Sequence, residues 1–215
     1  MTDYNKELIS FLDKSPTAFH AIANIKARLE AEGYTELAES AKWELSEGGK
    51  YFVVRNDSSI IAFRTPIFDF TSFMISAAHS DSPAFKVKEN PEIVENGYVK
   101  LNVEGYGGML MAPWLDRPLS VAGRIIVKNG NKYEAKLINV DRDLLLIPNV
   151  AIHMNRDANK GQTWNAQVDM LPVLGSADEV KGSFMRIIAE SAGVSDSDIL
   201  SHDLFLYVRD NGKVW

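Results

Sequence analysis

The 215-residue sequence contains no cysteine, which excludes a disulfide framework, a thiolate metal site and a cysteine nucleophile. No apolar run approaches the roughly 20 residues that a membrane-spanning helix needs. The first residues, MTDYNKELISFLDK, are charged and lack the apolar stretch of a secretory signal. The absence of cysteine and of a secretory signal is typical of proteins from the reducing cytoplasm, so we expect a cytoplasmic protein. The absence of a long apolar run gives no reason to expect a membrane partner.

A basic surface is also missing. The chain has 23 basic and 29 acidic residues, a net charge of -6, and no stripe of Lys and Arg interleaved with aromatic residues. An acidic surface disfavours binding to phosphate backbones, so nucleic acid is not an expected partner. The hydrophobic and charged fractions, 46% and 24%, lie near globular averages and exclude wholesale disorder. The length predicts one large domain or two small ones.

Three common catalytic motifs are absent: His-Glu-x-x-His, Gly-x-Ser-x-Gly, and the Gly-Lys-Ser/Thr of a phosphate-binding loop. The segment 105–108 (GYGG) is rich in glycine, but no helix start follows it to hold a phosphate. This segment therefore predicts a tight turn rather than a nucleotide site.

The order of apolar patterns predicts an α/β fold. Ser15 as N-cap and Pro16 at the first helical position start an amphipathic helix that ends near Gly33. Short apolar runs at 51–54, 59–63 and 72–78 predict strands, and the last is continuous enough for a strand covered on both faces.

From about Ala84 the sequence becomes rich in short β-like runs. The turn 129–131 (NGN) between 124–128 and 133–138 predicts a hairpin. A helix is expected at 178–192, and a short strand follows at 204–208.

His79 is the histidine whose position is most informative. It directly follows the run 72–78, so we expect it at the C-terminal end of a strand, where ligands and catalytic groups collect in α/β sheets. Asp81 lies two residues on and faces the same way in an extended chain. Its carboxylate can orient the imidazole toward a metal. Spacing alone leaves open a surface histidine beside a solvated aspartate, and no second ligand stands at a recognisable spacing.

The other three histidines have plainer interpretations. His153 lies among apolar residues, a setting typical of a hydrogen-bonded core histidine. His20, on the amphipathic helix, is expected to be structural. His202 lies in the acidic segment 196–203 and is expected to be exposed to solvent.

Six stretches, in the order found in one known family, together cover nearly the whole chain. They are 15–20 (SPTAFH), 78–83 (AHSDSP) with 86–88 (KVK), 106–108 (YGG), 114–117 (WLDR), 122–127 (AGRIIV) and 147–156 (IPNVAIHMNR). In these stretches the chain resembles the N-terminal half of the M18 metalloaminopeptidases, the group of aspartyl aminopeptidases and their bacterial relatives.

The resemblance implies part of an α/β zinc-exopeptidase domain with an inserted β-rich assembly domain. Its boundaries would make 1–84 the first part of the peptidase domain, 85–202 the inserted domain and 203–215 the start of the return. It also implies two zinc ions in each complete active site, although other divalent ions are possible. The reaction would be the removal of N-terminal residues from peptides by a metal-activated water. The enzyme would work as a homo-oligomer.

The resemblance assigns roles to three residues. His79 matches the first metal ligand of the family, and Asp81 matches the carboxylate that orients it. His153 matches the inserted-domain histidine that reaches the active site of a neighbouring subunit and assists there. The core-histidine interpretation of His153 stands beside this one.

One departure matters for function. Family members are about twice as long as this chain, and their remaining metal ligands and general base match no position up to Trp215. We therefore expect the chain to be inactive alone, as a truncated product or as one half of a split protein. A non-catalytic assembly or regulatory module derived from such a peptidase is the alternative, and an unrelated α/β binding domain is a third. The preferred N-terminal residue of the substrate stays open.

Overall fold

The computed structural model describes residues 3–214, which divide into two compact units. The first unit runs to Ser82 and includes the short segment from Gly212, and the second is Pro83–Asn211. The second unit extends past the expected return at 203, because residues 199–208 form a strand of its sheet. The assignment of the two units to a peptidase and an assembly domain stays a prediction. No helix among residues 3–214 is long and apolar enough to cross a membrane.

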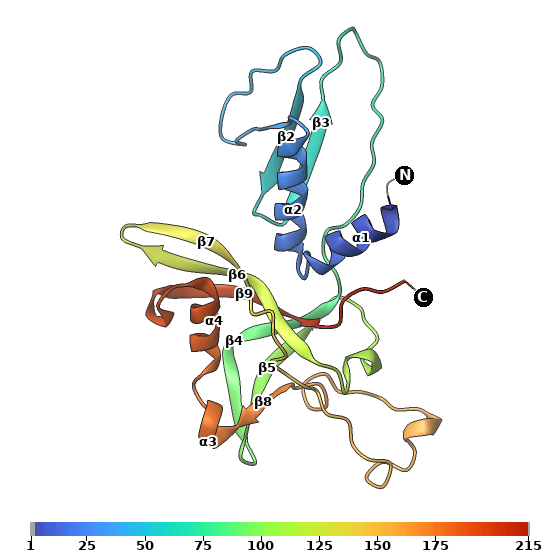
Figure 1. Ribbon diagram of the computed structural model, residues 1–215, viewed down its shortest axis with the longest axis vertical. Helices are drawn as coiled ribbons and strands as arrows, with labels where there is room; N and C mark the ends of the chain where they lie inside the picture. Colours follow the sequence, from blue (N-terminus) through green and yellow to red (C-terminus); the bar gives the residue numbers. More distant parts are fainter. Residues whose placement is uncertain (1–2, 215) are drawn as a thin grey trace. The chain divides into compact units, whose positions relative to one another are not determined.

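The first unit combines two helices with a small sheet (Figure 1). The sheet has the order β1-β2-β3, with β1 parallel and β3 antiparallel to β2. Phe52 at the centre of β2 is fully buried, and α2 contributes the buried Phe19 and Ile22. The elements are α1 (Tyr4–Asp13), α2 (Ala18–Ala31), β1 (Thr35–Glu36), β2 (Lys50–Arg55) and β3 (Ser59–Arg64).

Helix α2 begins later than the sequence predicts. Its N-cap is Thr17, not Ser15, and Thr17 has an extended backbone with φ -142° and ψ 165°. The Thr17 hydroxyl contacts Nδ1 of His20 at 2.9 Å instead of capping the helix. The predicted end is confirmed, because Gly33 has φ +78°, a conformation that glycine adopts without strain.

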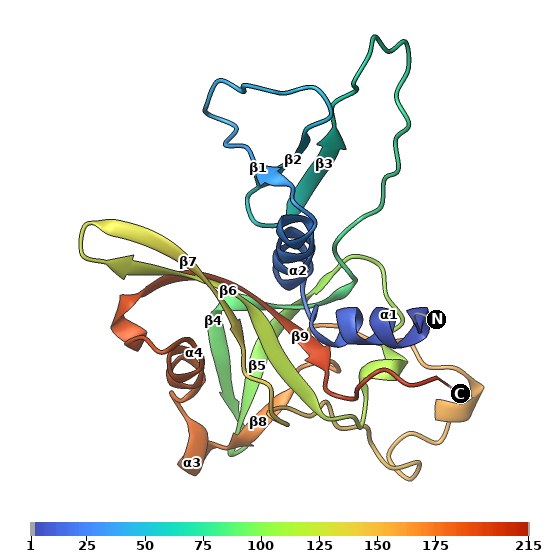
Figure 2. The same ribbon diagram turned by 45° about the horizontal axis from the view of Figure 1, so that its top comes forward.

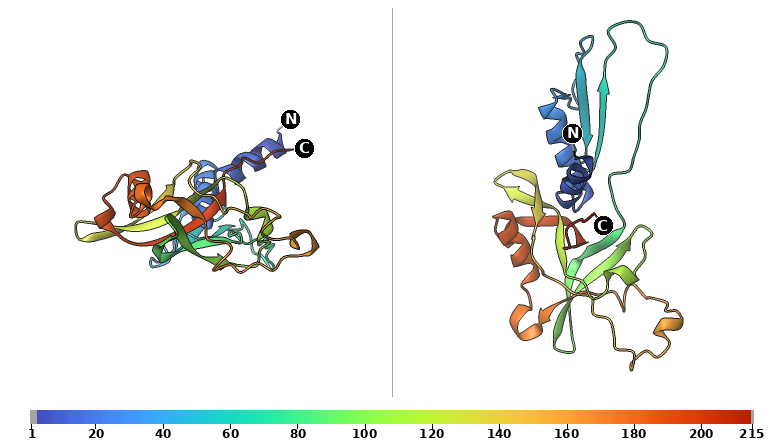
Figure 3. Two further views of the ribbon diagram at one scale, coloured as in Figure 1. Left: turned by 90° about the horizontal axis from the view of Figure 1, so that it is seen from below. Right: turned by 45° about the vertical axis from the view of Figure 1, so that its right-hand side comes forward.

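Strands β2 and β3 confirm two predicted strands, but the predicted strand at 72–78 is wrong. Among the described residues no strand pairs with this segment, which runs apart from β3 (Figure 3). A strand needs a neighbour to satisfy its backbone groups. Phe73 and Ile75 are 78% and 85% exposed, so the apolar character that predicted burial is present without a cover.

The second unit contains a six-stranded antiparallel sheet in the order β7-β6-β9-β4-β5-β8 (Figure 2). The strands are β4 (Ala84–Glu95), β5 (Tyr98–Tyr106), β6 (Leu119–Asn129), β7 (Lys132–Asn139), β8 (Val173–Ser176) and β9 (Ile199–Val208). The helices are α3 (Ala177–Val180) and α4 (Phe184–Ala192), with 3-10 turns η1 (Ala112–Trp114), η2 (Ala158–Lys160) and η3 (Asp196–Asp198). The predicted hairpin is confirmed as β6–β7.

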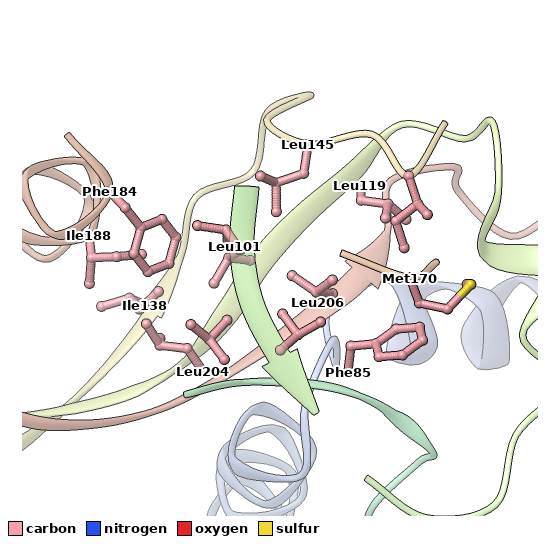
Figure 4. Packing of buried hydrophobic residues seen from close by; sticks show 14 of the residues in the cluster. Phe85, Leu101, Leu119, Ile138, Leu145, Met170, Phe184, Ile188, Leu204 and Leu206 are labelled. Atoms are coloured by element: carbon pink, nitrogen blue, oxygen red, sulfur yellow. The ribbon is translucent and has the colours of Figure 1, made fainter. Parts of the chain in front are cut away.

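The core of this unit lies between one face of the sheet and α4 (Figure 4). Phe184 and Ile188 of α4 are fully buried with Leu101 of β5 and Leu204 of β9. Because side chains alternate along a strand, Leu204 and Leu206 face this core while the residues between them face the other side. The sheet therefore buries one face within its own unit.

The single helix expected at 178–192 is interrupted. Gly182, with φ +72°, separates α3 from α4. The carboxylate of Glu92 accepts hydrogen bonds from the backbone N–H groups of Gly182 at 2.6 Å and Phe184 at 2.9 Å. These bonds satisfy donors that a helix start leaves unpaired. Gly193 ends α4 in the left-handed conformation, as predicted.

Candidate functional site

His79 and Asp81 lie together in the first unit, on the segment that follows β3. Nδ1 of His79 is 3.1 Å from Oδ1 of Asp81 and 2.9 Å from the Asp81 carbonyl oxygen. The His79 side chain is 80% exposed. Between them, the Ser80 hydroxyl donates to the carbonyl oxygen of Ser58 at 2.8 Å. This bond ties the segment to the β2–β3 turn.

The contacts of His79 determine which ring nitrogen is available. A carbonyl and an ionised carboxylate can only accept hydrogen bonds, so Nδ1 must carry the proton. In the neutral imidazole this leaves the lone pair on Nε2, as a metal-ligating histidine requires. The predicted orienting contact of Asp81 is thus present in the geometry, while the metal role of His79 stays a prediction.

A complete metal site needs more than this pair. Zinc in a catalytic site takes three protein ligands and an open position. Among residues 3–214 no group of three or more His, Asp or Glu side chains is arranged to hold a metal ion. Residues 3–214 therefore offer the His79–Asp81 pair but no complete group of metal ligands.

His153 lies in the second unit, in a loop between Ile147 and β8 that contains several turns and the 3-10 turn η2. Its side chain is exposed, so the core-histidine interpretation is wrong. The apolar neighbours that suggested a core, Val150, Ile152 and Met154, are exposed as well. The role of His153 at another subunit's active site stays a prediction.

The prediction that His202 lies in a segment exposed to solvent is wrong. It lies in β9 with 8% of its surface exposed, and neither ring nitrogen has a hydrogen-bond partner among the described residues. Burial lowers the pKa of His202, although the nearby Glu89 and Asp203 act in the opposite direction. The two-residue spacing of His202 from Leu204 and Leu206 is the sequence signal that could have revealed this.

The next residue, Asp203, forms an ion-pair cluster that sequence reasoning missed. Its carboxylate contacts Lys86 Nζ at 2.9 Å and Arg124 Nη2 at 3.0 Å. Burial favours a raised pKa for Asp203, but the hydrogen bonds from Lys86 and Arg124 outweigh it and hold the pKa below its usual range. The cluster joins β4, β6 and β9 on the face opposite the core. Asp203 is 117 positions from Lys86 and 79 from Arg124, so no local pattern signals the cluster.

The family comparison covers nearly all of the chain. Residues 11–215 match the family model described as aminopeptidase I zinc metalloprotease (M18). The chain therefore belongs to the M18 family of zinc metallopeptidases.

Curated relatives agree with this assignment. A probable M18 family aminopeptidase 2 of Clostridium acetobutylicum is 47% identical over 220 residues, which span 99% of this chain and 51% of the relative. A protein of the same name in Pseudomonas aeruginosa is 41% identical over 221 residues, again 99% of this chain and 51% of the relative. The chain thus spans about half the length of the curated relatives it matches.

Solved structures show the same fold and the same half coverage. In the complex of Ape4 and Nbr1, the matching chain has a TM-score of 0.93 and 29% identity, over 97% of this chain and 44% of that one. For Chaetomium thermophilum mApe1 the TM-score is 0.83 and the identity 30%, over 97% of this chain and 51% of that one. The expected α/β fold class is confirmed as part of the M18 architecture.

Proposed function

We propose that this chain is one half of a zinc-dependent aminopeptidase, which removes N-terminal residues from peptides once the other half is present. The observation that carries the proposal is the His79–Asp81 pair, in which Asp81 contacts Nδ1 of His79, in a chain that matches the M18 family over residues 11–215. We also propose that the complete site holds two zinc ions.

The chemistry divides between the chain and its missing complement. Zinc in a complete site polarises a peptide carbonyl and lowers the pKa of its bound water. This chain contributes the Nε2 lone pair of His79, and Asp81 keeps that imidazole in the ligating tautomer. Because the described residues offer one ligand arm, the chain alone is proposed to be inactive.

The exposed segment 72–78 supports the need for a complement. Phe73 and Ile75 are exposed, and no strand among the described residues pairs with their backbone. Apolar side chains next to unpaired backbone groups are typical of a surface that another polypeptide covers. The relatives are about twice as long, and the half absent from the match is the polypeptide proposed to cover this segment.

We further propose that the protein works as a homo-oligomer in which His153 assists at the site of a neighbouring copy. The support is the loop around His153, whose residues Val150, Ile152 and Met154 are exposed apolar side chains. Such a loop is better suited to contact another protein surface than to remain in water. His153 would then stabilise negative charge that develops on the substrate carbonyl.

A chimera tests the proposal. This chain replaces the matching half of the Clostridium acetobutylicum relative, and zinc content and release of N-terminal residues from peptides are measured. His79→Ala is expected to lose most bound zinc and at least about a hundred-fold in activity, because it deletes a ligand. His153→Ala, which also removes an exposed histidine, is the matched control for zinc. It should keep the zinc and lower turnover.

Two results would contradict the assignments. A His79→Ala chimera with normal zinc content would show that His79 is not a ligand. Unchanged turnover in the His153→Ala chimera would remove the proposed role of that residue.

A further inference from the structure

Strand β7 is a free edge of the six-stranded sheet. It is the first strand in the order β7-β6-β9-β4-β5-β8, and within residues 3–214 it pairs with β6 alone (Figure 2). Tyr133 and Leu137 on this strand are 72% and 40% exposed. A long edge with unpaired backbone groups is a template for pairing with another strand.

The hairpin turn determines which backbone groups of β7 face outward. Gly130 and Asn131 form a two-residue turn, so Asn129 and Lys132 face each other as the closing, hydrogen-bonded pair. Because backbone groups alternate in an antiparallel pair, the even-numbered residues of β7 bond to β6. The N–H and C=O groups of residues 133, 135 and 137 therefore point away from the sheet.

The side chains of β7 are complementary to the same strand in a second copy. When two β7 strands run antiparallel about a twofold axis at Ala135, each Glu134 lies opposite the partner copy's Lys136. In the same register each Tyr133 lies opposite Leu137. Opposite charges and apolar pairs at directly facing positions stabilise a sheet.

The neighbouring registers, shifted by one or two residues, are disfavoured. A shift by two residues in one direction places Glu134 opposite Glu134 and Lys132 opposite Lys136, and the opposite shift places Lys136 opposite Lys136. Like charges at facing positions are destabilising. A shift by one residue would set outward-facing backbone groups against inward-facing ones. The charges of this edge thus favour the register about Ala135 over the registers two residues to either side of it.

The two charged groups are accessible for this pairing. Lys136 lines an open, polar pocket together with Glu134 and Ser195. Within residues 3–214 Lys136 forms no ion pair, and Glu134 accepts one hydrogen bond, from Asn129 at 3.0 Å.

We propose that β7 edges of two copies pair antiparallel about Ala135 and join two six-stranded sheets into one continuous sheet.

This proposal specifies one contact of the homo-oligomer proposed above, and it requires neither zinc nor substrate. The test is the mass of the full 215-residue chain in solution, measured by analytical ultracentrifugation from about 10 to 200 µM, a range suited to a small interface. Glu134→Lys and Lys136→Glu each place like charges at the facing positions. Each is expected to raise the Kd of the dimer at least about ten-fold.

Mixing the two variants provides the decisive control. Glu134→Lys carries two lysines at the facing positions, and Lys136→Glu carries two glutamates there. In an equimolar mixture the lysines of one variant would face the glutamates of the other, so a heterodimer should form. The double variant Glu134→Lys/Lys136→Glu should dimerise like the wild type.

A second pair of variants controls for the change in net charge. Glu44→Lys and Lys42→Glu, at exposed positions in the first unit, alter the charge of the chain by the same amount without touching β7. Neither should change the Kd.

Three results would overturn the proposal: a wild-type chain that is monomeric over the whole range, single variants that dimerise as the wild type does, or a mixture that stays monomeric. Restored pairing in the mixture also shows that the single variants are folded. Because the readout is mass, its failure leaves the aminopeptidase proposal standing.

Discussion

At the scale of single residues, His202 has the environment that most alters its chemistry. It is buried in β9 with neither ring nitrogen hydrogen-bonded among the described residues, and burial lowers its pKa below the ordinary 6.5. Glu89 and Asp203 favour the charged form, while Lys86 disfavours it, and burial outweighs the two carboxylates. The folded chain therefore prefers a neutral His202.

This preference makes stability depend on pH. Above pH 6.5 His202 is neutral in both states and its contribution to stability is fully present. As the pH falls below 6.5, the unfolded chain takes up the proton first, so stability is lost until the lowered pKa of the folded state is reached. We expect the wild-type Tm to fall between about pH 7.5 and 5.5, and His202→Leu to remove part of that fall.

Calorimetry at the two pH values checks this expectation. His20 has a pKa lowered by burial too, so some pH dependence should remain in the His202→Leu chain. His153→Leu, at an exposed position, is the matched control for replacing a histidine with leucine. Identical pH dependence in the wild type and His202→Leu would contradict the account.

Two residues show which features of the candidate site could and could not be predicted from the sequence. The His79–Asp81 contact followed from two-residue spacing, because such spacing brings side chains to one side of an extended chain. His202 was misplaced because the acidic residues before it resemble a solvated turn. In the structure the strand already begins at Ile199. The side chain of His202 is therefore on the same face of the strand as the core residues Leu204 and Leu206.

At the scale of elements, the close pairing of β6 and β9 depends on Gly123. Gly123 has φ +157°, and a Cβ built there would collide with the backbone oxygen of Asp203. Gly123→Ala is therefore expected to force β6 and β9 apart and to lower the free energy of unfolding by roughly 1–3 kcal/mol. Gly108→Ala is the matched control, since no atom lies within 4 Å of the added Cβ.

Urea denaturation of the two variants checks this prediction. Because Arg124, the residue after Gly123, lies opposite Asp203 across the same pair of strands, the variant should weaken the Lys86–Asp203–Arg124 cluster as well. Equal unfolding free energies for Gly123→Ala and Gly108→Ala would show that the strands can separate without cost.

Prediction of elements succeeded where the pairing partners are near in sequence. The β2–β3 and β6–β7 pairs are hairpins, so apolar runs and turn residues were sufficient to find them. The run 72–78 failed because an apolar pattern does not supply a hydrogen-bonding neighbour. The break in the helix at Gly182 depends on Glu92, a residue 90 positions away that no local pattern reveals.

At the scale of the whole molecule, the chain consists of two units that differ in how far their apolar residues are buried. The second has its own core between α4 and the six-stranded sheet. The first carries the His79–Asp81 pair but exposes the apolar segment that leads to it. Under the proposed function, this segment is the surface that the half of the relatives outside the match would cover.

The most direct test of this account is the zinc content of the purified 215-residue chain after dialysis against micromolar zinc, with aminopeptidase activity measured on the same sample. A single protein ligand cannot hold a catalytic metal ion tightly. We therefore expect well under one zinc ion per chain and no release of N-terminal residues. Close to two zinc ions per chain, together with activity, would contradict it, because a complete active site would then lie within these residues.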